Sequence, residues 1–344
     1  LRTNFQFFFL GKMLKAGLVA LALGLIIFIN FTGQCHGDGA LQFRFGFYNG
    51  KCNGEDVEAI VRGVIQESYM KDPTLVAALV RMQFHDCFVT GCDASILLDG
   101  SNSEKTAFPN LSVRGFDIID AAKAAVEAVC PGVVSCADII VMAARDVVSL
   151  AGGNRYAVQT GRRDGLVSLA QNVDLPAPFI SVSDSIKAFA NKGLGVVDMV
   201  YLLGGHTVGV AHCSLFEDRL YNFQNSGKPD PTMNLVLLEM LKSRCPQKAR
   251  VDNTADLDEN PVSAYVVDNS YYQQILLGRG ILQIDQELAL DPRTTDTVKY
   301  AAVVGYDFQI KFAQAMVKLG AVQVINGTQG EIRTSCRVVN NSQK

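Results

Sequence analysis

Two histidines and one arginine are the side chains best placed for acid–base or ligand chemistry in this 344-residue sequence. Arg81 and His85 are four residues apart in an apolar stretch, a spacing that puts both on one face of a helix. There a histidine can take and return a proton while the arginine supplies a fixed positive charge. His206 follows two glycines in the run LLGGHTVG, which leaves room for a flat, bulky partner. An isolated Arg–His pair is more often ordinary helix surface, so the neighbouring residues decide its meaning.

The segment that begins at His85, HDCFVTGCDAS, is dense in oxygen atoms that could bind a metal ion. It contains two carboxylates, two hydroxyls and carbonyls exposed by turns. Hard oxygen ligands of this kind suit Ca²⁺, although the spacing is not that of an EF-hand. A disulfide between Cys87 and Cys92 would fix this loop.

Other chemistries have weaker support in the sequence. The run around His206 does not match the dinucleotide-binding fingerprint, and no strand precedes it. A zinc site needs three or four His, Cys or carboxylate ligands, and oxidised cysteines would leave few histidines to supply them. His212, beside Cys213, is more typical of a packed or solvated residue. With 31 basic and 34 acidic residues, the net charge of −3 provides no basic excess for nucleic acid.

The N-terminal region has the pattern of a secretory signal. Residues 16–31 form an uncharged apolar run, with Lys12 and Lys15 before it and small or polar residues after it. The run is slightly short for a transmembrane helix of about 20 residues, and an uncleaved membrane anchor is the alternative. We expect a signal over residues 1–37, in which 1–12 are an artefact ahead of Met13. The remaining residues, 38–344, are expected to form one domain.

Cleavage after residue 37 would remove Cys35, the odd one of nine cysteines. An even number in an oxidising compartment indicates four disulfides, and counting alone leaves 105 pairings open. The eight remaining cysteines are Cys52, Cys87, Cys92, Cys130, Cys136, Cys213, Cys245 and Cys336.

The elements that must position these residues are helices. Apolar residues recur at helical spacing and predict a mainly-α fold, while long alternating strand patterns are absent. Ser135 is a predicted N-cap of one helix that ends before Gly152. The other expected helices begin at Asp72-Pro73, at about Phe116, at about Val196 and at about Phe308, with weaker patterns over residues 184–191 and 231–242.

Several motifs resemble those of the secretory plant haem peroxidases, the class III or horseradish-type family. Residues 81–95, RMQFHDCFVTGCDAS, resemble the distal-helix signature, and residues 203–209, LGGHTVG, resemble the proximal one. Residues 104–110, 175–179, 268–272 and 285–288 add further matches in the same order. The resemblance covers roughly residues 47–339. It implies the plant haem-peroxidase fold, one haem b between a distal and a proximal helical half, and two Ca²⁺ ions.

On the proximal side, the resemblance implies that His206 is the haem iron ligand and that Asp285 accepts the other ring N–H of that histidine. On the distal side, it implies that His85 moves a proton between the two oxygens of H₂O₂. Arg81 would stabilise the negative charge that develops as the O–O bond breaks.

Two further distal residues complete the implied network. Asn110 would hydrogen-bond His85 and keep it neutral, and Glu104 would anchor the network behind them. Asn110 also begins a glycosylation sequon, which we expect to be unused because the role is buried. The sequons at Asn326 and Asn340 are better candidates for glycans.

The resemblance also implies ligand sets and disulfide pairs. The first Ca²⁺ site comprises Asp86, Val89, Gly91, Asp93 and Ser95. The second comprises Thr207, Asp258, Ser263 and Asp268, where the match is looser because residues 258–268 are two longer than the horseradish pattern. The implied disulfides are Cys52–Cys130, Cys87–Cys92, Cys136–Cys336 and Cys213–Cys245.

The implied function is a secreted, monomeric peroxidase that reduces H₂O₂ and oxidises phenolic donors in two one-electron steps. Donors would bind at the exposed haem edge beside Pro176, and the absence of tryptophan excludes oxidation through an indole. The destination is the extracellular space or cell wall, or a vacuole, with no stable membrane association after cleavage. The alternatives are a non-catalytic wall protein on the same fold, oxidation of auxin or production of superoxide, and a zinc or thiol protein with free cysteines.

Overall fold

The computed structural model describes residues 43–340, so residues 1–42 and 341–344 lie outside the described part. The predicted signal segment, its cleavage site and Cys35 all lie outside it. Within residues 43–340, no helix combines the length and the apolar character needed to cross a membrane.

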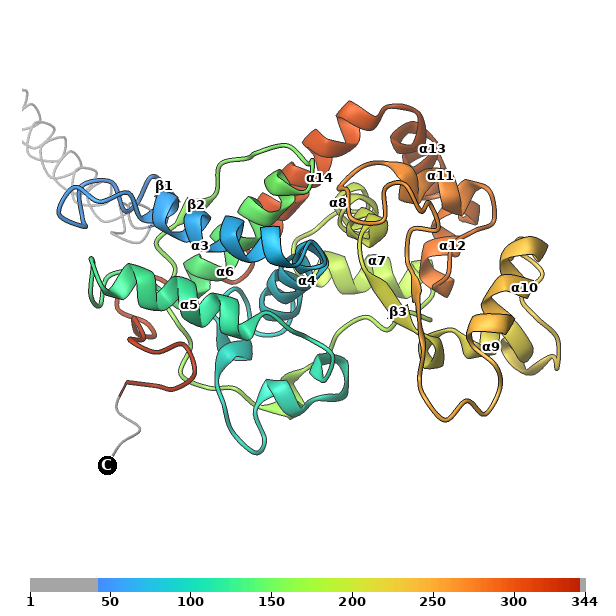
Figure 1. The fold of residues 1–344 in the computed structure, drawn as a ribbon, viewed down its shortest axis with the longest axis horizontal. Helices are drawn as coiled ribbons and strands as arrows, with labels where there is room; N and C mark the ends of the chain where they lie inside the picture. The colour runs from blue at the N-terminus through green and yellow to red at the C-terminus, as the bar shows by residue number, and fades with distance from the viewer. Residues whose placement is uncertain (1–42, 341–344) are drawn as a thin grey trace, which may run out of the picture. The chain divides into compact units, whose positions relative to one another are not determined.

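The described residues form helices joined by loops, as the periodicity predicts (Figure 1). The helices are α3 (Val57–Lys71), α4 (Leu75–Cys87), α5 (Phe116–Glu127), α6 (Cys136–Leu150), α7 (Val182–Asn191), α8 (Val196–Leu203), α9 (Glu217–Tyr221), α10 (Leu235–Arg244), α11 (Ser270–Leu276), α12 (Gln283–Leu290), α13 (Thr295–Val303) and α14 (Gly305–Leu319). Short 3₁₀ turns include η2 (Glu104–Thr106), η3 (Phe108–Asn110) and η5 (Gly204–Thr207).

Strand structure is limited to two small antiparallel pairs in residues 43–340. β1 (Arg44–Phe45) pairs with β2 (Gln159–Thr160), and β3 (Val210–His212) pairs with β4 (Thr254–Asp256). The second pair holds the segment after η5 against the segment that precedes Leu257.

Helix α6 is the centre of the first helical group, because every residue from Cys136 to Val148 is buried. Helices α3, α4 and α5 pack against it. Ser135 begins the helix as predicted, since its hydroxyl accepts a hydrogen bond from Asp138 N at 3.1 Å. Each large aliphatic side chain buried in this group contributes about 1.5–3 kcal/mol relative to exposure. The group therefore gives α4 a rigid support.

The second group consists of α8, α11, α12, α13 and α14, in which consecutive helices from α11 to α14 pack on one another and α8 packs on α13 and α14 (Figure 1). Helix α4 and the turn η5 are in contact, which brings the two groups together. The residues predicted to act from opposite sides are therefore carried on adjacent elements.

Two predicted helix starts differ from the structure. Helix α4 begins at Leu75 because Asp72 ends α3 by donating its N–H to Ser68 O, so Pro73 lies in the connecting turn. Helix α14 begins at Gly305, ahead of the predicted Phe308.

The structure contains the four disulfides that the resemblance implies. A zinc or thiol protein would need free cysteines, and all eight cysteines of the described chain are paired. Among residues 43–340, no three His, Cys, Asp or Glu side chains form a metal-binding group. These findings remove the support for the thiol-based alternative.

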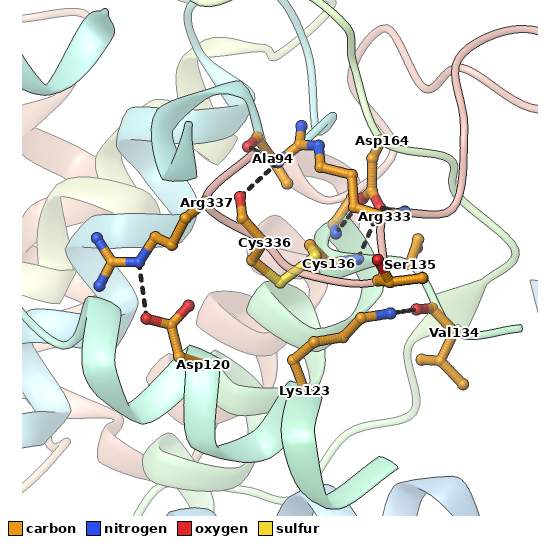
Figure 2. The surroundings of a disulfide bond; sticks show 12 residues. Ala94, Asp120, Lys123, Val134, Ser135, Cys136, Asp164, Arg333, Cys336 and Arg337 are labelled. Atoms are coloured by element: carbon orange, nitrogen blue, oxygen red, sulfur yellow. Dashed lines mark hydrogen bonds and ion pairs between the residues drawn. A yellow bond between two sulfur atoms is a disulfide. The ribbon is translucent and has the colours of Figure 1, made fainter. Parts of the chain in front are cut away.

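The C-terminal segment is fastened to α6 through the Cys136–Cys336 disulfide (Figure 2). Arg333 is fully buried beside it, and its guanidinium donates to the carbonyl oxygens of Ala94 at 3.0 Å and Gly165 at 2.9 Å. The carboxylate of Asp164 lies against the N-terminus of α6. It accepts three backbone N–H groups, from Cys136 at 3.1 Å, Ala137 at 2.9 Å and Arg333 at 2.9 Å. One buried carboxylate thus joins the helix to the C-terminal segment.

Replacing Asp164 by alanine is expected to lower the free energy of unfolding by about 3 kcal/mol, because buried donors at a helix N-terminus lose their acceptor. Denaturant unfolding measures the difference. Asp117→Ala on the exposed side of α5 is the control and should change stability by less than about 0.5 kcal/mol. Equal stabilities for the two variants would contradict the anchoring role of Asp164.

Candidate active site

The distal side of the candidate site is built on α4, which places Arg81 and His85 on one face as their spacing predicts. The Nδ1 atom of His85 donates to Asn110 Oδ1 at 2.6 Å. Its Nε2 atom accepts from Arg81 Nε at 3.1 Å. The hydrogen bond to Asn110 fixes the tautomer, so Nε2 carries the lone pair that can take a proton.

The segment around η3 holds both partners of this arrangement. Asn110 is buried and its Nδ2 donates to Glu104 O at 2.8 Å. The guanidinium of Arg81 donates to Pro109 O at 2.8 Å and to Ser112 Oγ at 3.1 Å. A glycan would attach to the same Nδ2 atom of Asn110, so this geometry favours an unused sequon. The contacts from Pro109 and Ser112 were not predicted, although Pro109 directly precedes Asn110 and Ser112 is the third residue of its sequon.

His85 is neutral at physiological pH. Burial and then the charge of Arg81 lower its pKa to about 3, while the hydrogen bond to Asn110 opposes this shift. A neutral imidazole is the form that accepts a proton.

The proximal side is built on η5 and α12. His206 donates from Nδ1 to the carboxylate of Asp285, at 2.9 Å to Oδ1 and 3.1 Å to Oδ2. Asp285 is fully buried, and Tyr271 donates a second hydrogen bond to its Oδ1 at 2.9 Å. Burial opposes protonation of His206, but Asp285 outweighs it and raises the pKa of that histidine. Nε2 of His206 is left as the atom able to ligate a metal.

The two sides face the same region. Helix α4, which carries Arg81 and His85, is in contact with η5, which carries His206. A Cβ on Gly205 would lie 3.6 Å from Val80 on α4. His206 retains 30% of its side-chain exposure, in contrast with the buried Asp285.

The structure gives a different reason for a glycine at position 204 from the one inferred from the sequence. A Cβ there would lie 2.2 Å from the hydroxyl of Tyr272 and 2.8 Å from Phe308. The space beside Gly204 is filled by these aromatic side chains and not by a flat ligand, so that part of the interpretation is wrong.

The first predicted Ca²⁺ site is a buried acidic cluster behind His85. Asp86 Oδ2 accepts from Ala94 N at 3.0 Å, and its Oδ1 is buried without a hydrogen bond from the described residues. Burial, followed by the nearby Asp93 and Glu104, raises the pKa of Asp86 well above its ordinary value. Neighbouring buried carboxylates are costly unless a cation compensates them. The residues therefore fit a Ca²⁺ ion.

Glu104 contributes to two parts of this region. Its backbone carbonyl holds Asn110, while its buried carboxylate lies near Asp93 and Ser95. Burial raises the pKa of Glu104 to about 7, Ser95 lowers it, and Asp93 raises it further. The backbone of Glu104 thus supports the distal network, and the carboxylate extends the acidic cluster.

The backbone carbonyls expected to bind the same ion lie in a tight loop. Gly91 has a φ of +110°, and a Cβ there would lie 2.5 Å from Gln323 O, so glycine is required. Lys192 Nζ donates to Val89 O at 2.9 Å, a contact that the sequence did not predict. A carbonyl oxygen has two lone pairs, so Val89 can accept this bond and bind a cation.

The residues of the second predicted Ca²⁺ site also lie together. Thr207 Oγ1 donates to Asp268 Oδ1 at 3.2 Å, and Ser263 Oγ donates to Asp258 Oδ2 at 3.3 Å. Burial raises the pKa of Asp258 to about 6, and Asp268 adds to that rise. Asp258 and Ser263, for which the resemblance was looser, therefore lie near Thr207 and Asp268. Ser270, which donates to Asp258 Oδ1 at 3.1 Å, was not predicted.

Pro176 lies in the loop between η4 (Ala170–Asn172) and α7. Pro178 O in the same loop accepts a hydrogen bond from Ile284 N at 3.1 Å, which ties the loop to α12. Phe179 and Phe108 are 61% and 76% exposed. Exposed aromatic rings are available to stack on a flat donor.

The comparisons with known proteins agree with this geometry. The model of the family described as peroxidase matches residues 61–303. The chain is 51% identical to Peroxidase 60 of Arabidopsis thaliana over 312 residues, which cover 90% of this chain and 92% of that protein. It is 50% identical to Peroxidase 57 of the same plant over 299 residues, covering 87% and 93%. Peroxidase N1 of Nicotiana tabacum is 43% identical over 302 residues, covering 86% and 90%. The chain therefore belongs to the peroxidase family.

Within that family it is a class III plant peroxidase, and the activity of the chain is that of a peroxidase. The alternative of a non-catalytic wall protein has no support in the comparisons or in the candidate site.

Proposed function

We propose that this peroxidase binds one haem b between α4 and η5, with His206 Nε2 as the iron ligand, and uses it to reduce H₂O₂. The observation that carries the proposal is the pair of hydrogen bonds on Nδ1 of His85 and of His206. Each bond fixes a tautomer and leaves Nε2 as the reactive atom of its ring. The bound haem supplies the redox chemistry.

On the distal side, one residue transfers the proton and another stabilises the negative charge. His85 Nε2 takes the proton from one oxygen of H₂O₂ and returns it to the other, while Asn110 holds the imidazole in place. The guanidinium of Arg81, oriented by Pro109 O and Ser112 Oγ, stabilises the negative charge that develops on the departing oxygen. The proximal Asp285 draws the Nδ1 proton of His206 towards itself and increases electron donation from Nε2.

The donors are small phenols, which are oxidised in two one-electron steps at a rim beside Pro176. Phe108 and Phe179 offer exposed rings there, and the Pro176 carbonyl can accept a phenol hydroxyl. An open rim with few directed polar groups discriminates weakly among small phenols.

The protein is secreted by the signal over residues 1–37 and acts as a monomer of residues 38–344 in the extracellular space, cell wall or vacuole. The four disulfides support an oxidising compartment. The net charge of −3 favours no nucleic-acid partner.

The test is a spectrum of the purified chain reconstituted with haem. We expect a Soret band that shifts when H₂O₂ is added. Absence of that band after reconstitution would refute the proposal, since every assigned role depends on the haem.

Calcium removal gives a separate prediction. The protein should contain two Ca²⁺ ions per chain by atomic absorption, and Asp86→Asn should contain one, because its buried Oδ1 is a proposed ligand. Chelation should destabilise the fold, by about 2.7 kcal/mol per site when the ion had been a hundredfold above its Kd. Asp117→Asn serves as the control and should retain both ions. Retention of two ions by Asp86→Asn would contradict the first ligand set.

A further inference from the structure

Three buried tyrosines form a continuous aromatic path that starts at His206. The ring of Tyr271 meets the imidazole of His206 edge-on, with centroids 6.2 Å apart. Tyr272 follows at 5.0 Å from Tyr271, and Tyr201 follows at 6.3 Å from Tyr272. All three tyrosines are buried, with between 0% and 3% of their surface exposed. The path therefore leads from the proximal side of the candidate haem pocket through α11 into α8.

The hydroxyl partners of the three tyrosines differ in a way that matters for oxidation. A phenol that loses an electron also loses its proton, so it needs a base within hydrogen-bond distance. Tyr271 donates to the carboxylate of Asp285 at 2.9 Å, and Tyr201 donates to Asp307 Oδ2 at 3.1 Å. Tyr272 donates to the carbonyl of Val200 at 3.0 Å, which is not a base. Both ends of the path have a proton acceptor, and the middle ring connects them.

The outer end of the path lies close to the protein surface. Tyr201 donates its hydroxyl to Asp307 on α14, and Tyr300 lies on α13, a helix that packs against both α8 and α14. Tyr300 is 52% exposed near the end of α13. Helices α8, α11 and α13 are in contact, so the path crosses three packed elements (Figure 1). With no tryptophan in the sequence, tyrosine is the side chain available for such a role.

We propose that Tyr271, Tyr272 and Tyr201 conduct electrons from a second oxidation site at Tyr300, whose donors are phenols attached to macromolecules too large to reach the haem edge. The inference rests on the haem binding proposed above. Such donors would contact the exposed ring of Tyr300 and need not enter the rim beside Pro176.

The steps balance with H₂O₂ as the oxidant. The O–H bond of Tyr201 breaks, its proton moves to Asp307, and its electron passes inward through Tyr272 and Tyr271. Tyr300 then gives up one electron and releases its phenolic proton to solvent, and this electron restores Tyr201 as the proton returns from Asp307. A macromolecular phenol reduces Tyr300 by one electron, and Tyr300 takes back a proton from solvent. The donor releases its own proton to solvent and becomes a phenoxyl radical. Two such cycles supply the two electrons that one H₂O₂ needs, with two protons from solvent, to form two waters.

The first experiment compares one phenol in two sizes, free tyramine and tyramine coupled to dextran, in the haem-loaded enzyme. Tyr201→Phe keeps the ring but removes the oxidisable O–H bond. We expect oxidation of tyramine-dextran to fall at least tenfold and oxidation of free tyramine to stay within twofold. Tyr69→Phe on α3, away from the path, is the matched control and should oxidise both donors normally.

Equal oxidation of tyramine-dextran by wild type and Tyr201→Phe would overturn the proposal. An equal fall with both donors would also overturn it, because Tyr201 would then support the haem pocket and not a second site. Loss of the Soret band in the wild-type protein would instead count against the proposed haem function, so the two failures are distinguishable.

The second experiment locates the radical directly. The wild-type enzyme is mixed with one equivalent of H₂O₂ and the spin trap 2-methyl-2-nitrosopropane without donor, and labelled peptides are identified by mass spectrometry. We expect the label on Tyr300 in wild type and its loss in Tyr201→Phe. Tyr306 is more exposed, at 72%, and reports radical transfer through solvent. Labelling of Tyr306 as strongly as Tyr300, or persistence of the Tyr300 label in Tyr201→Phe, would contradict the path.

Discussion

Replacing His85 by leucine is expected to slow the reaction with H₂O₂ by about 10²–10⁴-fold while leaving haem bound. Leucine removes the Nε2 lone pair that takes the proton, whereas the proposed iron ligand, His206, is on a different element. Stopped-flow measurement of the Soret change after mixing with H₂O₂ gives the rate. The absorbance ratio of the Soret band to the protein band shows whether haem is retained.

The pH dependence of the same reaction follows from the state of His85. Burial and Arg81 lower the pKa of His85 to about 3, so the imidazole stays neutral throughout the neutral and mildly acidic range. The rate should therefore be flat from about pH 8 to pH 5 and fall only as the pH approaches that pKa, where the protonated ring can no longer act as a base. A rate that halves near pH 6.5, the ordinary value for histidine, would contradict the buried and neutral state.

His212→Leu is the matched control for this prediction. His212 is also a histidine, and its Nδ1 lies 3.7 Å from Asp252 Oδ2 at a partly exposed position. The variant should react with H₂O₂ at the wild-type rate. If His85→Leu reacted equally fast, His85 would have no part in proton transfer.

Local sequence patterns were sufficient for the parts of the fold in which one helix determines its own geometry. The spacing of Arg81 and His85 gives a common face because α4 is regular between them. Ser135 caps α6 through a hydrogen bond that spans three residues. Such features depend on neighbours in the sequence, and periodicity detects them.

The remaining features depend on tertiary contacts. Helices α11, α12 and α13 are only seven to nine residues long, so isolated periodicity is weak, and their packing on one another stabilises them. The hydrogen bond from Tyr271 to Asp285 joins residues 14 apart on different helices. The support that Pro109 O gives to Arg81 spans 28 residues. No local pattern specifies these pairs, and the disulfide pairing came from resemblance because counting leaves it undetermined.

Removing the Cys136–Cys336 disulfide by alanine substitution at both positions is expected to lower the free energy of unfolding by about 5 kcal/mol. The two cysteines are 200 residues apart, so the bond restricts the unfolded chain over most of its length. The folded state should retain its local geometry, because Arg333 and Asp164 hold the same segment against α6 through buried hydrogen bonds (Figure 2). Denaturant unfolding in the presence of Ca²⁺ and haem measures the change.

The Cys87–Cys92 disulfide supplies the matched control for that measurement. Its cysteines are only five residues apart, and the same entropic relation gives about 2 kcal/mol for its removal. Thiol titration of the denatured, unreduced wild-type domain should find no free thiol, and each double variant should stay thiol-free because its pair is absent. Equal losses from the two variants would show that chain entropy does not set the stabilisation, and that native contacts around each bond do. A larger loss of unfolding free energy on removal of Cys136–Cys336 than on removal of Cys87–Cys92 would show that each disulfide stabilises the protein by restricting the unfolded chain.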